Sequence, residues 1–402
     1  MLLRNGFILL LCLPNLGQAF YQWQDNGAEI ELRGFFSGLA LGINNPNDAL
    51  LFADDKLITA GLNGRLMLDV QRSSLSFEMH AVQTIIDDKL ATGGGQTPVL
   101  QGVERSGALS SQFANEHAEL AIDRLNVQYS TDKMNIKVGR QPINLAATYY
   151  FTPNDFFAPF AAQTFFRHYK LGVDAVRLDW QLDDLSQVSF ISVVNYKDEI
   201  DHWSRAPDWS ETAYLARLST LFDTFELTGL IAKINGDEII GLDFQGELFD
   251  WLGVRGEGHI RFPDDRRQSR DIKFSLGLEH RWENSLTLRI EQFYHRLAAT
   301  DIEDYSASTL IETNSFYLAR NYTALGASYE VTPLLLTDAV WLINNHDDSS
   351  LLALYATSSL SDEAELSIGL SISMGKQPDK GVLKSEFASY PDSFNIEYRL
   401  YF

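Results

Sequence analysis

The stretch "DSFNIEYRLYF" (residues 392–402) indicates the fold most directly, because polar and apolar side chains alternate along it. Successive side chains of an extended strand point to opposite faces, so this alternation predicts a strand with two unlike faces. One face would carry Phe394, Ile396, Tyr398, Leu400 and Phe402, and the other Asn395, Glu397, Arg399 and Tyr401. Only the second of these faces suits contact with water.

The same alternation recurs from about Glu29 onward, in segments of 10 to 15 residues. Two clear examples are "DIKFSLGLEHRW" (residues 271–282) and "EAELSIGLSISM" (residues 363–374). Strands of soluble sheets usually have about five or six residues, whereas a tilted strand needs about ten to cross a bilayer. The length of these segments therefore predicts strands that cross a membrane.

The links between these segments are of two kinds that alternate along the chain. Eight tight links, such as residues 183–184 and 283–284, separate nine mostly longer ones, among them residues 87–115 and 147–169. Short turns at one end and long loops at the other are typical of transmembrane barrels. The sequence therefore predicts an all-β fold, a transmembrane antiparallel β-barrel of about 18 strands with 16 as the alternative, and periplasmic N and C termini.

The last strand is expected to pair with the first, near residues 29–42, because an open sheet edge in hydrocarbon would leave backbone groups unpaired. The alternation slips at several points, for instance between Ile122 and Leu125 and between Ala175 and Val176, and these slips are interpreted as β-bulges or misplaced boundaries. Aromatic residues near the turn-side ends of the strands are expected to form a girdle at the membrane interface. They are Trp180, Trp251, Trp282, Tyr398 and Phe402.

Residues 1–19, "MLLRNGFILLLCLPNLGQA", have the build of a secretory signal peptide, with Arg4, an apolar run and small residues near the end. The expected organisation is a signal peptide (1–19) followed by one barrel domain (20–402). Cys12, the only cysteine, lies in the segment expected to be removed. No disulfide, thiolate nucleophile or cysteine-ligated metal is therefore expected, and export without disulfides favours a bacterial envelope protein. No cofactor and no metal site are expected.

Composition narrows the class of partners. The chain is 45% hydrophobic and 21% charged, which is compatible with a barrel whose strands alternate in polarity. The formal net charge of −22 argues against nucleic acid, which requires a basic surface.

The terminal "YRLYF", the signal peptide and the alternating strands together resemble a Gram-negative outer-membrane porin. This resemblance implies recognition of Phe402 by the barrel assembly machinery, contact with outer-membrane lipid and lipopolysaccharide, and a homotrimer. A second stretch, "KVGRQPINLAATYYFTPNDFFAPF" (residues 137–160), is similar to a segment of large porin-like proteins, in which Gly-Arg-Gln leads into a loop with Pro-x-Asp and a further Pro. The matching residues here are Gly139, Arg140, Gln141, Pro153, Asp155 and Pro159.

The loop at residues 147–169 is the candidate constriction. It holds six phenylalanines, too many for a loop left in water, so it is expected to fold against the wall or into the lumen. Asp155 and Arg167 would move inward with it. The alternative is that these rings cover a subunit contact or the rim near lipopolysaccharide.

Charged residues on the polar faces of the strands and in this loop are the candidate pore lining, because a pore selects by the charges and width it presents. The candidates are Arg140, Asp155, Arg167, Arg177, Arg217, Arg255, Glu257, Arg289, Glu291 and Arg399. Mixed signs are expected to orient polar solutes. The alternative is that these residues pair with each other and merely fill the lumen.

The function expected from these features is passive diffusion of small polar solutes or ions across the bacterial outer membrane. One alternative is an outer-membrane phospholipase or protease, with His202 near Ser204, or His117 near Ser110 and Ser111, as candidate pairs. The other is a barrel that sheathes a partner protein. The chain carries no metalloprotease, nucleophile-elbow or phosphate-loop motif, and 18 strands leave room for an aqueous channel.

Overall fold

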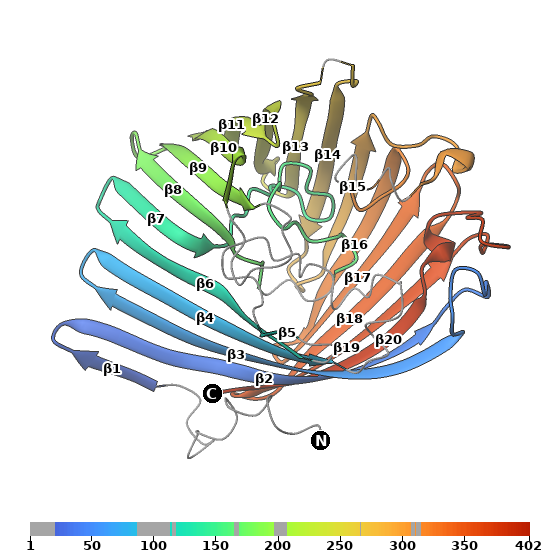
Figure 1. The fold of residues 1–402 in the computed structure, drawn as a ribbon, viewed down its shortest axis with the longest axis horizontal. Helices are drawn as coiled ribbons and strands as arrows, with labels where there is room; N and C mark the ends of the chain where they lie inside the picture. Colours follow the sequence, from blue (N-terminus) through green and yellow to red (C-terminus); the bar gives the residue numbers. More distant parts are fainter. Residues whose placement is uncertain are drawn as a thin grey trace.

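The computed structural model describes residues 21–86, 113–114, 118–164, 169–196, 207–265, 267–306, 310 and 315–402. This part of the chain forms one antiparallel sheet that curves around a central space (Figure 1). Among the described residues, no helix has the length and apolar character needed to cross a membrane.

The strands and short 3₁₀ helices are β1 (Tyr21–Asp25), β2 (Ala28–Asn44), β3 (Lys56–Arg72), β4 (Leu75–Ile86), β5 (Phe113–Ala114), β6 (Ala118–Ser130), β7 (Met134–Gln141), β8 (Val173–Gln181), β9 (Ser186–Tyr196), β10 (Pro207–Phe222), β11 (Phe225–Ile234), β12 (Asp237–Leu248), β13 (Leu252–Phe262), β14 (Asp271–Arg281), β15 (Thr287–His295), η1 (Ile302–Asp304), β16 (Asn321–Thr332), β17 (Leu335–Asn344), β18 (Ser350–Ser361), β19 (Ala364–Met374), η2 (Phe387–Ser389) and β20 (Asp392–Tyr401).

The sheet closes into a barrel. In the described part of the chain, β1 and β5 each pair with one neighbour, and the remaining 18 strands form the closed ring. The last strand, β20, pairs with β2 from Phe35 opposite Tyr401 to Asn44 opposite Asp392. The predicted strand number and the predicted pairing of the last strand with the first are both confirmed.

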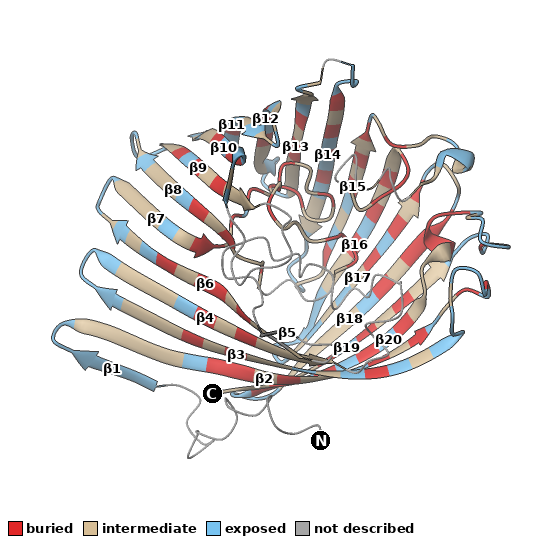
Figure 2. Ribbon diagram, in the orientation of Figure 1, coloured by how far each residue is buried: buried red, intermediate tan, exposed pale blue. Residues whose placement is uncertain are grey.

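The two faces of β20 separate as the alternation predicts. Phe394, Ile396 and Tyr398 are 50%, 36% and 46% exposed on the outside of the barrel. Asn395, Glu397 and Arg399 face the interior and are only 2%, 8% and 7% exposed. Buried and exposed residues alternate along most strands in the same way (Figure 2). The apolar face therefore points outward and the polar face inward.

Phe402 departs from this pattern because it lies in the seam between β20 and β2. Its backbone N–H donates to the Gly34 carbonyl over 3.0 Å, and the Gly34 N–H donates to the Phe402 carbonyl over 2.9 Å. Its ring stacks on Phe36 with the ring centroids 5.0 Å apart. The terminal aromatic side chain thus stabilises closure and is not an exposed ring of the girdle.

The other girdle residues, Trp180, Trp251, Trp282 and Tyr398, are exposed on the outer surface. The short strand β1 adds Tyr21 and Trp23 to the exposed aromatic residues. It pairs with the part of β2 that extends beyond the end of β20, through a tight turn at Asn26 and Gly27. Both turn residues have positive φ, at 49° and 77°, as a two-residue hairpin turn of this type requires.

The chain ends at the short-turn end of the barrel, because the Tyr401 N–H donates to Glu363 in the turn between β18 and β19.

The slip in alternation between Ile122 and Leu125 is a β-bulge. The pairing of β4 with β6 shifts at His80 and Ala81, so that Asp123 is the extra residue. The pairing of β7, β8 and β9 is regular at Ala175 and Val176, so a bulge there is wrong. Ala175 is an apolar residue on the inner face because a loop packs over it, as described below.

Candidate functional site

The segment between β7 and β8, residues 142–172, folds into the barrel and is called the inner loop below (Figure 1). It is described except for residues 165–168, so the predicted inward position of Arg167 lies outside the described residues. Ile143, Leu145 and Phe157 of the inner loop pack against apolar residues of β8, β9 and β10, including Ala175. The expected infolding of residues 147–169 is confirmed for their described part.

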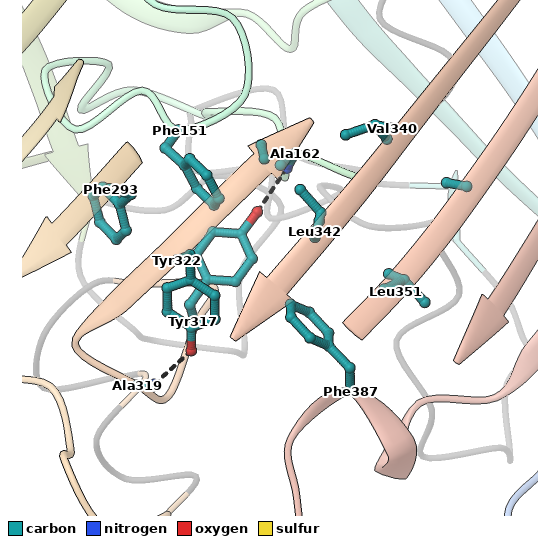
Figure 3. Packing of buried hydrophobic residues seen from close by; sticks show 12 residues of the cluster. Phe151, Ala162, Phe293, Tyr317, Ala319, Tyr322, Val340, Leu342, Leu351 and Phe387 are labelled. Carbon is teal, nitrogen blue, oxygen red and sulfur yellow. Dashed lines mark hydrogen bonds between the residues drawn. The ribbon is translucent and has the colours of Figure 1, made fainter. Parts of the chain in front are cut away.

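An aromatic cluster holds the centre of the inner loop (Figure 3). Phe151 is almost fully buried and stacks on Phe293 of β15, with centroids 5.1 Å apart. Tyr317, from the loop between β15 and β16, meets Phe151 edge to face and accepts a hydrogen bond from the Ala162 N–H over 2.8 Å. Three segments distant in sequence are therefore packed together inside the barrel.

Glu257 of β13 binds backbone N–H groups of the inner loop. Its Oε2 accepts hydrogen bonds from Ala147 and, over 3.0 Å, from Thr148. Its Oε1 accepts from the Asn154 N–H over 2.9 Å. A buried carboxylate is costly unless such donors surround it, so the loop and this side chain stabilise each other.

Glu291 of β15 binds the next three N–H groups. Its Oε2 accepts from Tyr149 over 2.9 Å, and its Oε1 accepts from Tyr150 over 3.1 Å and from Phe151 over 2.6 Å. The Ser275 hydroxyl donates to Oε1 as well, over 3.0 Å. Together the two carboxylates bind five consecutive N–H groups, at residues 147–151. We call Glu257 and Glu291 the carboxylate pair.

Tyr149 lies between two arginines of the wall. The guanidinium carbon of Arg255 is 4.0 Å from the ring centroid, and that of Arg289 is 4.2 Å from it. Both guanidinium groups also bind Glu279 of β14, over 2.8 and 3.1 Å. Two cations share one carboxylate here, and the tyrosine ring supplies additional cation–π attraction.

The returning end of the inner loop contacts the opposite side of the barrel. Tyr169 stacks on Phe35 of β2 with centroids 5.6 Å apart, and the guanidinium of Arg65 on β3 lies 4.1 Å above the Tyr169 ring. Arg399 of β20 lies 5.0 Å from the Phe35 ring. The inner loop therefore spans the interior, from β13 and β15 to β2 and β3.

Other predicted site residues occupy paired positions. Asp155 is buried against Lys170, and this burial raises the pKa of the Asp155 carboxyl. Arg140 binds Asp174 over 2.8 Å at the root of the inner loop. Arg177 pairs with Asp179 over 2.9 Å, and Arg217 with Asp243 over 3.2 Å.

Sequence reasoning missed several residues of this site. Tyr149 and Tyr169 carry no signal in a loop rich in aromatic residues, because their role depends on arginines far away in sequence. Arg65 binds Asp123 over 2.7 Å, and Asp123 also pairs with Arg124. The slip at Ile122 marked the position of Asp123, but the sequence does not show which residue would face it.

A cavity of about 220 Å³ lies on the other side of the inner loop from the Tyr149 stack. The loop contributes Phe156 and Phe160 to its lining, and β13 and β14 contribute Arg261 and Lys273. Phe316, from the loop between β15 and β16, completes one side.

Glu386 joins three outer loops and is the centre of what we call the outer junction. Its carboxylate accepts hydrogen bonds from the Leu318 N–H over 2.9 Å, from Asn344 Nδ2 over 2.8 Å, and from the Tyr322 hydroxyl. Its own N–H donates to Asp347 over 2.7 Å. Burial raises the pKa of the Glu386 carboxyl to about 7.

The described residues contain no group of three or more histidine, cysteine, aspartate or glutamate side chains placed to hold a metal ion.

A closed antiparallel barrel of 18 strands, apolar outside and polar inside, has the architecture of a porin, and in the described part of the chain a long loop folds into it. Solved structures with the same fold include OccAB4 of Acinetobacter baumannii, which is 10% identical over 93% of this chain and 98% of that one, with a TM-score of 0.56. A BenF-like porin from Pseudomonas fluorescens Pf-5 is 11% identical over 92% and 98%, with a TM-score of 0.59. OccK2 (OpdF) of Pseudomonas aeruginosa is 13% identical over 92% and 97%, with a TM-score of 0.58.

At these identities the likeness establishes the fold. No protein-family model matches the sequence, and no curated protein sequence matches it.

Proposed function

We propose that this protein is an outer-membrane porin that lets small polar solutes or ions diffuse passively through its interior. The observation that carries the proposal is the reversal of polarity across the wall, with apolar residues outside and ionised residues inside. A barrel of this strand number is wide enough to hold water where loops do not fill it. The inner loop narrows that space.

The charges near the inner loop support selection among polar solutes. On one side Arg255 and Arg289 share Glu279, and on the other Arg65 and Arg124 share Asp123. Arg399 is paired with Glu397 over 3.0 Å on the same side as Arg65. The charges that a pore presents set its preference, so the partly exposed Arg255, Arg289 and Glu279 are expected to act on passing solutes directly. The buried group around Asp123 is expected to act only through its electric field.

The proposal includes an outer-membrane location after removal of residues 1–19, with the short turns in the periplasm. The exposed aromatic residues at the short-turn end, such as Trp251 and Trp282, support a membrane interface there, and the short turns themselves support the orientation, because outer-membrane barrels have their short turns in the periplasm. Contacts with lipopolysaccharide at the loop end, recognition of Phe402 by the assembly machinery, and a homotrimer belong to the same proposal.

Liposome swelling tests the proposal. Liposomes that contain the purified mature protein are expected to swell in isotonic solutions of small sugars or amino acids, at rates that fall as solute size rises. Protein-free liposomes give the baseline. Swelling no faster than this baseline, from protein that runs as a folded, heat-modifiable barrel, would contradict a diffusion channel.

A further inference from the structure

We propose that Glu257 and Glu291, the carboxylate pair, are positioning residues that hold the inner loop across the interior and thereby set the width of the path. The inference rests on the proposed function, because a path must exist for its width to be measured. It extends that function by assigning the constriction to two wall side chains that are themselves shielded from the solute.

Their burial separates them from the solute. Glu257 is 3% exposed and Glu291 is 2% exposed, beneath the backbone of the inner loop. Because water does not reach these two carboxylates, the N–H groups that they bind balance their charges, as in the concave backbone sites that bind anions. Conversely, N–H groups 147–151 would be buried without partners if the carboxylates were absent, which backbone groups rarely tolerate.

The hydrogen-bond pattern requires a carboxylate at each position. Both oxygens of Glu257 accept from loop N–H groups, and so do both oxygens of Glu291. A glutamine has the same shape but replaces one oxygen with an amide group that only donates. Either orientation of that glutamine would therefore set a donor against a donor, so Glu→Gln should release part of the loop.

The order of residues along the strands shows what release would open. On β13, Arg255 lies nearest the short turns, followed by Glu257 and then by His259, which lines the cavity behind the loop. On β15, Arg289, Glu291 and the cavity-lining Phe293 follow in the same order. The carboxylate pair thus holds the loop between the arginine layer and the cavity of about 220 Å³. If the loop were released, the space beside Arg255 and Arg289 would join this cavity.

The test compares Glu257→Gln, Glu291→Gln and the double variant with the wild type in planar bilayers. The measurements are single-channel conductance and the size of the largest polyethylene glycol that enters the channel and lowers its conductance. Both quantities are expected to rise in each single variant and to rise further in the double variant. A merely structural role would change the yield of folded protein and leave the polymer size unchanged.

Asp243→Asn is the matched control. Asp243 is also a wall carboxylate that is 3% exposed, but its described partners, Arg217 and Thr228, lie on β10 and β11. Its replacement removes the same charge without affecting the loop N–H groups, so the polymer size should equal that of the wild type.

A loop-side variant keeps the test decisive if the wall variants do not fold. Thr148→Pro combined with Tyr150→Pro removes one N–H donor to each carboxylate and leaves all strands intact. It is expected to admit larger polymers as well. If the folded wall variants or this loop variant admit polymers no larger than the wild type does, the inference is overturned. If the wild-type protein itself gives no channel conductance, the proposed function is refuted instead.

Discussion

At the scale of single residues, closure of the barrel depends on the space beside Gly34. A Cβ atom at this position would lie 2.4 Å from the Arg65 carbonyl oxygen and 2.5 Å from the Phe402 ring. The carbonyl belongs to the backbone of β3 and cannot move aside without breaking the strand pairing. Overpacking of this kind typically costs about 1–3 kcal/mol.

Gly34→Ala is therefore expected to reduce the yield of folded, heat-modifiable barrel. Gly38→Ala, on the same strand, is the control, because its Cβ would meet only a Leu62 methyl group at 3.6 Å. Equal yields for the two variants would show that the Phe402 seam does not limit closure.

Tyr149 is the second residue whose role can be tested alone. Tyr149→Ala removes the ring between Arg255 and Arg289, which exposes both guanidinium groups and loses a cation–π contribution of about 0.5–2 kcal/mol. The reversal potential under a salt gradient is expected to shift toward anion preference. Tyr149→Phe keeps the ring and should retain the wild-type value, so a shift of equal size in both variants would contradict the stacking account.

At the scale of elements, the outer loops are joined by a group whose charge depends on pH. Glu386 is buried among Asp347, Tyr305, Tyr322 and Tyr390, and its carboxyl pKa of about 7 lies above the ordinary value of 4.5. The protonated form is thus favoured in the folded state. The associated stabilisation is fully present below the ordinary pKa and is lost as the pH rises through about 7.

Hydrogen exchange of residues 315–320 and 386–390 measures this effect. Exchange should be slower at pH 5 than at pH 8, after correction for the intrinsic rates, and Glu386→Gln should abolish most of the difference. Equal protection at the two pH values in the wild type would contradict the assignment.

The elements also show where sequence patterns suffice. The alternation in β14, β19 and β20 correctly predicted which side chains face outward and which face inward. A strand with lipid on one side and water on the other alternates apolar and polar residues with a period of two. The same rule fails at Ala175, since the inner loop turns part of the interior into an apolar core. The alternation also does not reveal β1, which has only five residues. Nor does a local pattern show that Glu257 binds N–H groups about a hundred residues away in the sequence.

At the scale of the whole molecule, the protein is a barrel whose interior is spanned by the inner loop in the part of the chain that the structure describes. The chain as a whole has a net charge of −22, but the groups beside the inner loop are locally positive. Two arginines share one carboxylate at Glu279, and two more share one at Asp123. The inner loop is fixed at one end by the carboxylate pair and the Tyr149 stack, and at the other by Tyr169. The proposed path for solute runs beside the inner loop.

Single-channel recording of the purified mature protein in a planar bilayer is the decisive test of an open channel. We expect discrete, long-lived open steps whose conductance rises with salt concentration. Folded, heat-modifiable protein that inserts but gives no steps would contradict this expectation, because the interior would then be closed to ions.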